Sequence, residues 1–224
     1  MATSTALTGR QVRRSTPLSE AARTYVRRPT PWILGLLTLA AVAVRAVAGP
    51  VTWADAVVAV VPVLVFPFTE WVIHVVLLHW RPRRVLGLTL DPLVSRKHRE
   101  HHVDPSDLDL VFIPLPTLAL AIAGTVAGSL LVFRGGALAW TYLVVAGLLG
   151  SVYEWTHYLI HTDYRPRGAL YRAIWRHHRL HHFKNEHYWF TVTTTGTADR
   201  ILGTQPDATD VPTSPTARAL HTDA

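Results

Sequence analysis

Cysteine is absent from this chain of 224 residues. Its absence excludes disulfide bonds and thiolate metal sites, so any bound metal ion would have to be held by nitrogen or oxygen ligands. Charge is also absent from the apolar run at 115–133. No segment resembles a cleavable signal peptide, because the first apolar run begins only after thirty residues. The apolar runs and the nitrogen and oxygen ligands are therefore the features that indicate the fold and function of this chain.

Four long apolar runs indicate a membrane protein, in agreement with the positive mean hydropathy of +0.20. Crossing the hydrocarbon core takes about 20 apolar residues in a helix. We therefore expect an all-α fold, an integral membrane four-helix bundle in a membrane domain at 31–203. The expected spans lie at 32–49, 57–78, 115–133 and 137–160.

The formal net charge of +7 is compatible with nucleic-acid binding, but the distribution of basic residues argues against it. Arginine and lysine gather in residues 1–30, between the second and third spans, and after the fourth span, whereas the two glycine-containing turns carry at most one arginine each. This is the asymmetry of a multi-pass protein whose basic segments face the cytosol. We expect both termini there, with disordered tails at 1–30 and 204–224.

The histidines supply the strongest motif. The sequences His98-Arg-Glu-His101-His102 and His178-Arg-Leu-His181-His182 share the pattern His-x-x-His-His. Both fall in expected short amphipathic helices, at 92–102 and 168–182, where this spacing places three imidazoles within about 100° on one helix face. Neutral imidazole is a good ligand for iron, zinc and copper. The two triads therefore predict metal binding.

Two further histidine pairs lie at the cytosolic ends of the spans. His157 and His161 are one helical turn apart, whereas His74 and His79 are five residues apart, about 140° around an ideal α-helix. The second pair either serves two metals or lies in a distorted helix. Ten ligands are too many for one ion, so we expect a cytosolic helical cap with a dimetal site, formed by His74, His79, His98, His101, His102, His157, His161, His178, His181 and His182.

Other polar residues nearby have less certain roles. Glu70 and Glu154 precede His74 and His157 by four and three residues, so either carboxylate could accept the outer imidazole N–H of a ligand. Each could instead line a polar gap or remain protonated. His187 is a further candidate for supporting the ligands. His177 breaks the register of the second triad and is left out, and His221 lies in the expected tail and is given no role.

The order and spacing of these histidines on a four-span protein resemble the fatty acid hydroxylase/sterol desaturase superfamily, over about residues 55–203. Two stretches are most similar to fatty acid 2-hydroxylases. They are His-His-Val-Asp-Pro-Ser-Asp-Leu-Asp-Leu-Val-Phe-Ile-Pro at 101–114, and His-His-Phe-Lys-Asn at 181–185, running on to Phe-Thr-Val-Thr at 190–193.

The resemblance implies a membrane dimetal oxygenase, conventionally diiron, that uses O2 to hydroxylate a lipid C–H bond, with fatty acyl 2-hydroxylation as the expected reaction. By this resemblance the ten histidines hold two metal ions, iron being expected and zinc possible as the bound metal. No haem domain is recognised in the first 54 residues, so a separate electron donor (a ferredoxin, cytochrome or reductase) is expected.

Three alternatives compete with this interpretation. The histidine pattern also suits hydroxylation or desaturation of a carotenoid or a sterol-like lipid. A membrane metal transporter or metal-binding protein would use similar ligands, but a transporter is expected to place them near mid-membrane. A zinc protease is disfavoured because the first triad lacks the His-Glu-x-x-His spacing.

Overall fold

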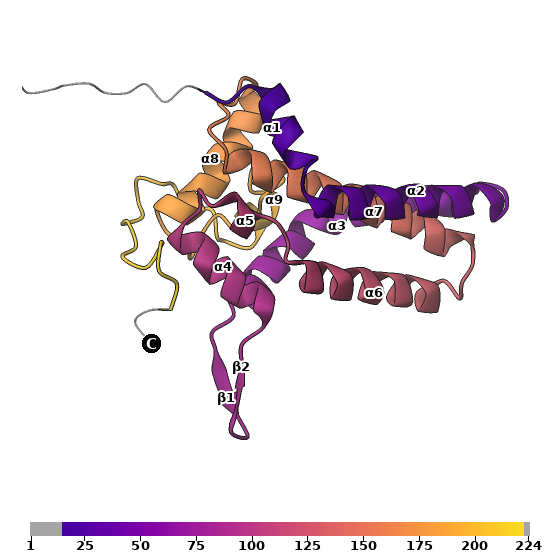
Figure 1. Cartoon of the computed structure of the whole chain (residues 1–224), viewed down its shortest axis with the longest axis horizontal. Helices are drawn as coiled ribbons and strands as arrows, with labels where there is room; N and C mark the ends of the chain where they lie inside the picture. The colour runs from indigo at the N-terminus through magenta and orange to yellow at the C-terminus, as the bar shows by residue number, and fades with distance from the viewer. Residues whose placement is uncertain (1–14, 222–224) are drawn as a thin grey trace, which may run out of the picture.

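Four long helices lie side by side in a computed structural model that describes residues 15–221, and the shorter elements gather at one end of them (Figure 1). The long helices are α2 (Pro29–Val47), α3 (Trp53–Val72), α6 (Leu115–Val132) and α7 (Ala137–Ile160). With their extensions, four helical stretches are long and apolar enough to cross a membrane. The predicted all-α class and four spans are confirmed.

The bundle packs through small residues inside and leaves large apolar residues outside. A Cβ atom at Gly147 of α7 would overlap the Thr38 side chain of α2, so glycine allows these helices to approach closely. Meanwhile Leu36, Leu64 and Leu120 are more than half exposed on the outer surface. In water this surface would be unfavourable, but lipid acyl chains are as apolar as leucine.

At the end of the bundle far from the cap, one buried ion pair connects three helices. The Arg45 guanidinium of α2 donates to the Asp55 carboxylate of α3 at 2.8 Å, and the Thr141 hydroxyl of α7 donates to the same carboxylate at 2.5 Å. Asp55 also accepts from the Thr52 main chain, completing a capping box at the start of α3. The arginine that interrupts the first span is thus neutralised inside the protein.

The shorter elements form a cap at the other end. It contains a π-helix, η1 (Ile73–Leu78), that continues α3, and the helices α4 (Leu93–Val103), α5 (Leu108–Val111), α8 (Ala169–Phe183) and α9 (Thr197–Ile201). Helices α4 and α8 confirm the amphipathic helices predicted at 92–102 and 168–182. Strands β1 (Arg83–Val85) and β2 (Leu88–Leu90) form an antiparallel hairpin that the sequence analysis did not predict.

The predicted disorder of the N-terminal tail is wrong for part of that tail. Residues Leu18–Tyr25 form helix α1, and Tyr25 packs its ring edge-on against Trp155 of α7 with 4.9 Å between ring centres. Leu18, Ala21, Ala22 and Tyr25 stand at the i, i+3, i+4 and i+7 spacing of an amphipathic helix, a pattern that the prediction of disorder overlooked, and the contact with α7 buries Ala21 and Tyr25. Residues 1–14 of the expected tail lie outside the described residues.

The predicted disorder of the C-terminal tail is also wrong for residues 204–221. This segment folds back over the cap, where Ala217 and Leu220 are buried and the Ser214 N–H donates to the Lys184 carbonyl at 2.8 Å. Its composition of Thr, Pro, Asp and Ala has no regular period, so its placement depends on contacts with the rest of the cap. Residues 222–224 lie outside the described part of the chain.

Candidate metal centre

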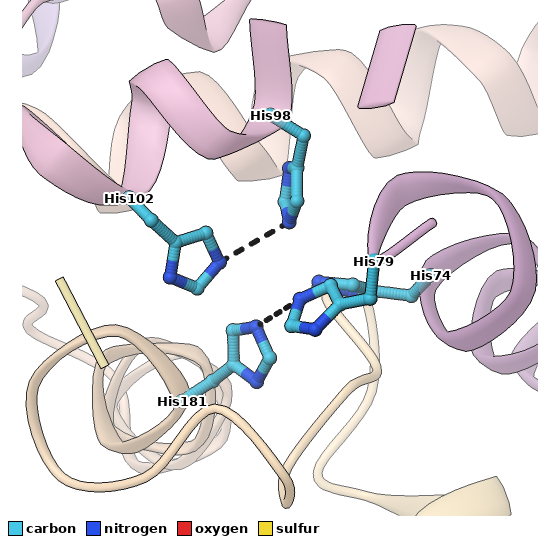
Figure 2. A group of neighbouring side chains, drawn as sticks. All are labelled: His74, His79, His98, His102 and His181. Atoms are coloured by element: carbon cyan, nitrogen blue, oxygen red, sulfur yellow. Dashed lines mark hydrogen bonds between the residues drawn. The ribbon is translucent and has the colours of Figure 1, made fainter. Parts of the chain in front are cut away.

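All ten predicted histidines meet in the cap, where they form two groups of five. Within each group, one ring nitrogen of every histidine lies within 4.8 Å of one from each of the others. Nine of the ten side chains are buried, and His79 is partly buried. The first group consists of His74, His79, His98, His102 and His181 (Figure 2). The second group consists of His101, His157, His161, His178 and His182.

Each triad is divided between the two groups. On α4, His98 and His102 belong to the first group and His101 belongs to the second. On α8 the division is reversed: His178 and His182 belong to the second group and His181 belongs to the first. Helix geometry explains the division, because residues at i and i+4 lie almost above one another while the residue at i+3 lies to one side. Each group thus contains two histidines from one triad, one from the other triad, and one span-end pair.

The two groups are neighbours. The rings of His102 and His182, which belong to different groups, have centres 4.3 Å apart, and those of His101 and His98 are 5.9 Å apart. Both groups therefore belong to one continuous, buried histidine cluster in which each triad helix contributes to both halves.

The π-helix η1 explains how His74 and His79 join the same group. The His79 N–H donates to the His74 carbonyl at 3.0 Å, the i to i−5 hydrogen bond of a π-turn. This wider turn brings residues five apart onto one side of the helix, where an ideal α-helix would separate them by about 140°. Of the two interpretations left open by the sequence, the distorted helix is the one observed.

Main-chain carbonyls orient several of the imidazoles. A hydrogen bond from Nδ1 fixes the ring tautomer and leaves Nε2 with a free lone pair. Four histidines donate in this way: His74 to Phe190 at 2.6 Å, His102 to Ala217 at 2.8 Å, His157 to Val111 at 3.1 Å and His181 to Tyr188 at 2.8 Å. Two of these carbonyls come from the loop after α8 and one from the C-terminal segment, which the sequence analysis had left without a role.

These bonds correct the roles expected of Glu70 and Glu154. The outer N–H groups of His74 and His157 go to carbonyl oxygens, so neither carboxylate accepts them. Glu70 instead accepts from the Thr193 main-chain N–H at 3.3 Å. Glu154 accepts from the Tyr25 hydroxyl at 3.4 Å and so connects α7 to α1.

The remaining histidines are placed as follows. His187 lies at the surface with its side chain 65% exposed, and it lines a cavity of about 440 Å³ that also reaches His79. His177 joins neither group, as expected from its register. His221 lies against the cap, with its Nε2 atom 2.9 Å from the His79 carbonyl oxygen, although no role was expected for it.

Asp199 of α9 is a residue that the sequence analysis missed. Its fully buried carboxylate lies 3.0 Å from Nε2 of His177 and accepts from the main-chain N–H groups of Phe190 and Thr191 at 2.8 and 2.9 Å. Burial alone would raise the pKa of Asp199, but hydrogen bonds from His177 and from the hydroxyl and main-chain N–H of Thr191 hold it below its ordinary value. Asp199 thereby fixes the loop whose Phe190 carbonyl orients His74. A single acid in a short polar stretch of sequence gives no signal for this function.

The electrostatics of the cap favour neutral imidazoles. Burial lowers the pKa of the eight grouped histidines that lie outside the membrane-spanning segments: His79, His98, His101, His102, His161, His178, His181 and His182. Neutral imidazole is the form that binds metal ions.

The donor set fits metal ions. Among the described residues, Nε2 of His74, Nε2 of His157 and both ring nitrogens of His101 are buried without a hydrogen-bond partner. The Nε2 atoms of His98 and His102 face each other at 3.2 Å. Bonds of about 2.1 Å from a shared ion would place adjacent ligand nitrogens about 3 Å apart. Nitrogen-only ligand sets suit iron, zinc and copper.

The fold and the site define an integral membrane helical protein with a histidine-rich centre that could hold metal ions. The sequence model of the fatty acid hydroxylase family matches residues 59–204, so the chain belongs to that family. The resemblance seen in the histidine pattern is thus confirmed. No solved structure matches the chain.

Curated relatives are named as 2-hydroxylases. The chain is 31% identical to the fatty acid 2-hydroxylase of Mus musculus over 60% of this chain and 36% of the relative. It is 28% identical to a dihydroceramide fatty acyl 2-hydroxylase of Arabidopsis thaliana, over 66% of this chain and 60% of the relative. Against the human fatty acid 2-hydroxylase the identity is 32%, over 56% and 33%. The chain thus spans about one to two thirds of these relatives.

Proposed function

We propose that this protein hydroxylates an acyl chain of a membrane lipid at C2, using O2 at a centre of two metal ions. The observation that carries the proposal is the division of ten buried histidines into two groups of five at one end of four membrane-spanning helices. Membership of the fatty acid hydroxylase family supports lipid hydroxylation, and the names of the curated relatives favour the 2-position.

In this proposal each histidine group holds one ion, with iron expected and zinc as the alternative metal. Bound iron would supply the chemistry by which O2, two electrons and two protons convert a C–H bond to C–OH and release one water. The electrons come from a separate ferredoxin, cytochrome or reductase. The chain itself contributes neutral ligands, and carbonyls that orient four of them.

The position of the centre favours attack near the lipid headgroup. His74 and His157 lie within the candidate spans, close to the ends that meet the cap. An acyl chain in the bilayer would therefore reach the centre with carbons near its carboxyl end, which is consistent with C2. The basic segments flank the same end of the bundle, and by the asymmetry of basic residues we assign this end and both termini to the cytosol.

Burial of the ligands supports the oxygenase chemistry in a second way. His102, His178, His181 and His182 have no exposed surface. A buried ligand cluster limits the access of water and would so limit side reactions at a bound metal ion.

Lipid analysis of an expression host tests the proposal. Cells producing the wild type should accumulate 2-hydroxy acyl chains, and cells producing His101→Ala should not, although both proteins reach the membrane. His187→Ala is the matched control, since it removes an exposed imidazole, and it should retain activity. Full activity in His101→Ala would overturn the ligand assignment. Oxidised carotenoids or sterols with unchanged acyl chains would instead assign a different lipid substrate.

A further inference from the structure

The β1–β2 hairpin has one face that is largely apolar. Its cross-strand pairs are Arg83 with Leu90, Arg84 with Thr89, and Val85 with Leu88. Because paired residues share a face and successive residues alternate, Val85, Leu88 and Leu90 project on one side with Arg83. Arg84 and Thr89 project on the other side. The hairpin is therefore amphipathic.

The apolar residues of the hairpin are strongly exposed. All six strand residues are exposed, with Leu88 at 70%, and Leu86 at the tip of the turn is 99% exposed. Isolated two-stranded hairpins have little stability of their own in water. A surface of this composition requires apolar surroundings.

The turn residues support the same conclusion. Leu86 and Gly87 both have positive φ, +50° and +80°, which defines a two-residue turn of the type that usually takes Asn-Gly or Asp-Gly. Asparagine and aspartate suit such a turn because they tolerate this conformation and interact with water. Leucine does neither, so its presence at a projecting tip is explained by an apolar environment.

The position of the hairpin identifies that environment. Figure 1 shows it projecting from the cap, beside the end of the bundle and roughly at right angles to the long helices. It follows directly from the span that ends at Leu78. A bilayer surface lies at right angles to the helices that span the bilayer. The hairpin therefore projects along the bilayer surface, beside the lipid-facing side of the bundle.

The base of the hairpin has the composition of a membrane interface. The Trp80 indole N–H donates to the Leu90 carbonyl at 3.2 Å, and the Arg83 guanidinium lies 4.7 Å from the centre of the Trp80 ring. Tryptophan and arginine are enriched where proteins meet lipid headgroups. An ion pair of 2.7 Å from Arg99 of α4 to Asp91 fixes this base to the cap.

We propose that the β1–β2 hairpin inserts its apolar face and tip into the boundary between headgroups and acyl chains of the bilayer that the bundle spans. Val85, Leu86 and Leu88 contact the acyl chains, and Arg83 and Arg84 lie at the level of the lipid phosphates. This insertion would fix the depth of the cap against the bilayer, independently of the metal chemistry.

Fluorescent labelling of single cysteines in the full chain, reconstituted in phosphatidylcholine–phosphatidylglycerol vesicles, tests the proposal. The native chain has no cysteine, so each label reports one position. Leu86→Cys and Leu88→Cys change exposed residues and should leave the fold intact. Asp210→Cys is the control, because Asp210 is exposed. It belongs to the C-terminal segment, which Figure 1 shows at the end of the cap away from the bundle. Quenchers attached to lipid acyl chains should quench the two hairpin labels several-fold more strongly than the control.

Two outcomes would overturn the proposal. Hairpin labels that are quenched by a water-soluble quencher as readily as the control label would place the hairpin in water. Labels shielded from both the aqueous and the lipid-attached quencher would place it against protein, such as a second copy of the chain.

Discussion

Removing two histidines from one group should release one metal ion and leave the other in place. The double variant His98→Ala with His102→Ala takes two of five imidazoles from the first group and none from the second. The two Nε2 atoms lie 3.2 Å apart in the wild type, so both are lost from one side of the same ligand shell. The mirror variant, His178→Ala with His182→Ala, does the same to the second group.

The expected magnitude follows from the number of ligands removed. Loss of a single hydrogen bond to a metal-bound histidine commonly weakens binding about 10- to 100-fold. Loss of two direct ligands should therefore weaken binding at the damaged group by more than about 100-fold. Metal content should fall from about two ions per chain to about one in each double variant.

Metal content is measured by mass spectrometry on protein purified in detergent, with circular dichroism as the measure of helix content. His187→Ala should keep the full metal content, because its imidazole belongs to neither group. The reasoning would be refuted if a double variant that retains its helix content loses both ions, since the groups would then form one inseparable site. It would also be refuted if no metal is lost.

Three other predictions concern the support of the site. Gly196→Ala should prevent correct folding, because its new Cβ would overlap the Gln205 side chain and lie 2.6 Å from His177, at a backbone φ of +88°. The control Gly203→Ala has a similar φ of +76° but open space around it, so it should cost only about 1–2 kcal/mol of folding free energy. Equal yields of folded protein for the two variants would contradict this. Asp199→Ala leaves two buried main-chain N–H groups unpaired and should destabilise the cap by about 3 kcal/mol, visible in thermal unfolding, and an unchanged melting temperature would reject the role of Asp199. Acid should destabilise the metal-free protein. Burial lowers the pKa of the eight grouped histidines outside the spans in the folded state, so the unfolded chain binds more protons below about pH 6.5, and stability present above that pH is lost as the pH falls. Thermal unfolding at pH 7.5, 6.5 and 5.5 measures this loss, and equal stability at all three would argue against neutral buried imidazoles.

Several features followed from local patterns in the sequence. Four apolar runs predicted the four membrane-spanning helices, and the His-x-x-His-His spacing predicted which residues would gather in the cap. These succeeded because helix periodicity and apolar length are properties of a short stretch of chain. The histidine pattern also indicated the family, which the sequence comparison confirmed.

Local patterns failed where a segment is fixed by distant contacts. The segment at 204–221 depends on the cap. The helix at Leu18–Tyr25 is a different case, because its apolar residues do stand at helical spacing and pack against α7. Glu70 and Glu154 were near candidate ligands in sequence, but the carbonyls of Phe190 and Val111 reach His74 and His157 instead. The spacing of residues along one helix does not predict which hydrogen-bond acceptor another segment of the chain places beside a histidine.

The sequence alone excluded thiolate ligands, because cysteine is absent, and its two histidine triads predicted imidazole ligands for any bound metal ion. Only the tertiary structure decided that each triad serves two groups, because the direction that His101 or His181 faces depends on how α4 and α8 lie against η1 and α7. The chemistry of a ligand belongs to its side chain. Five histidines come together in each group because helices that are far apart in the chain pack against one another.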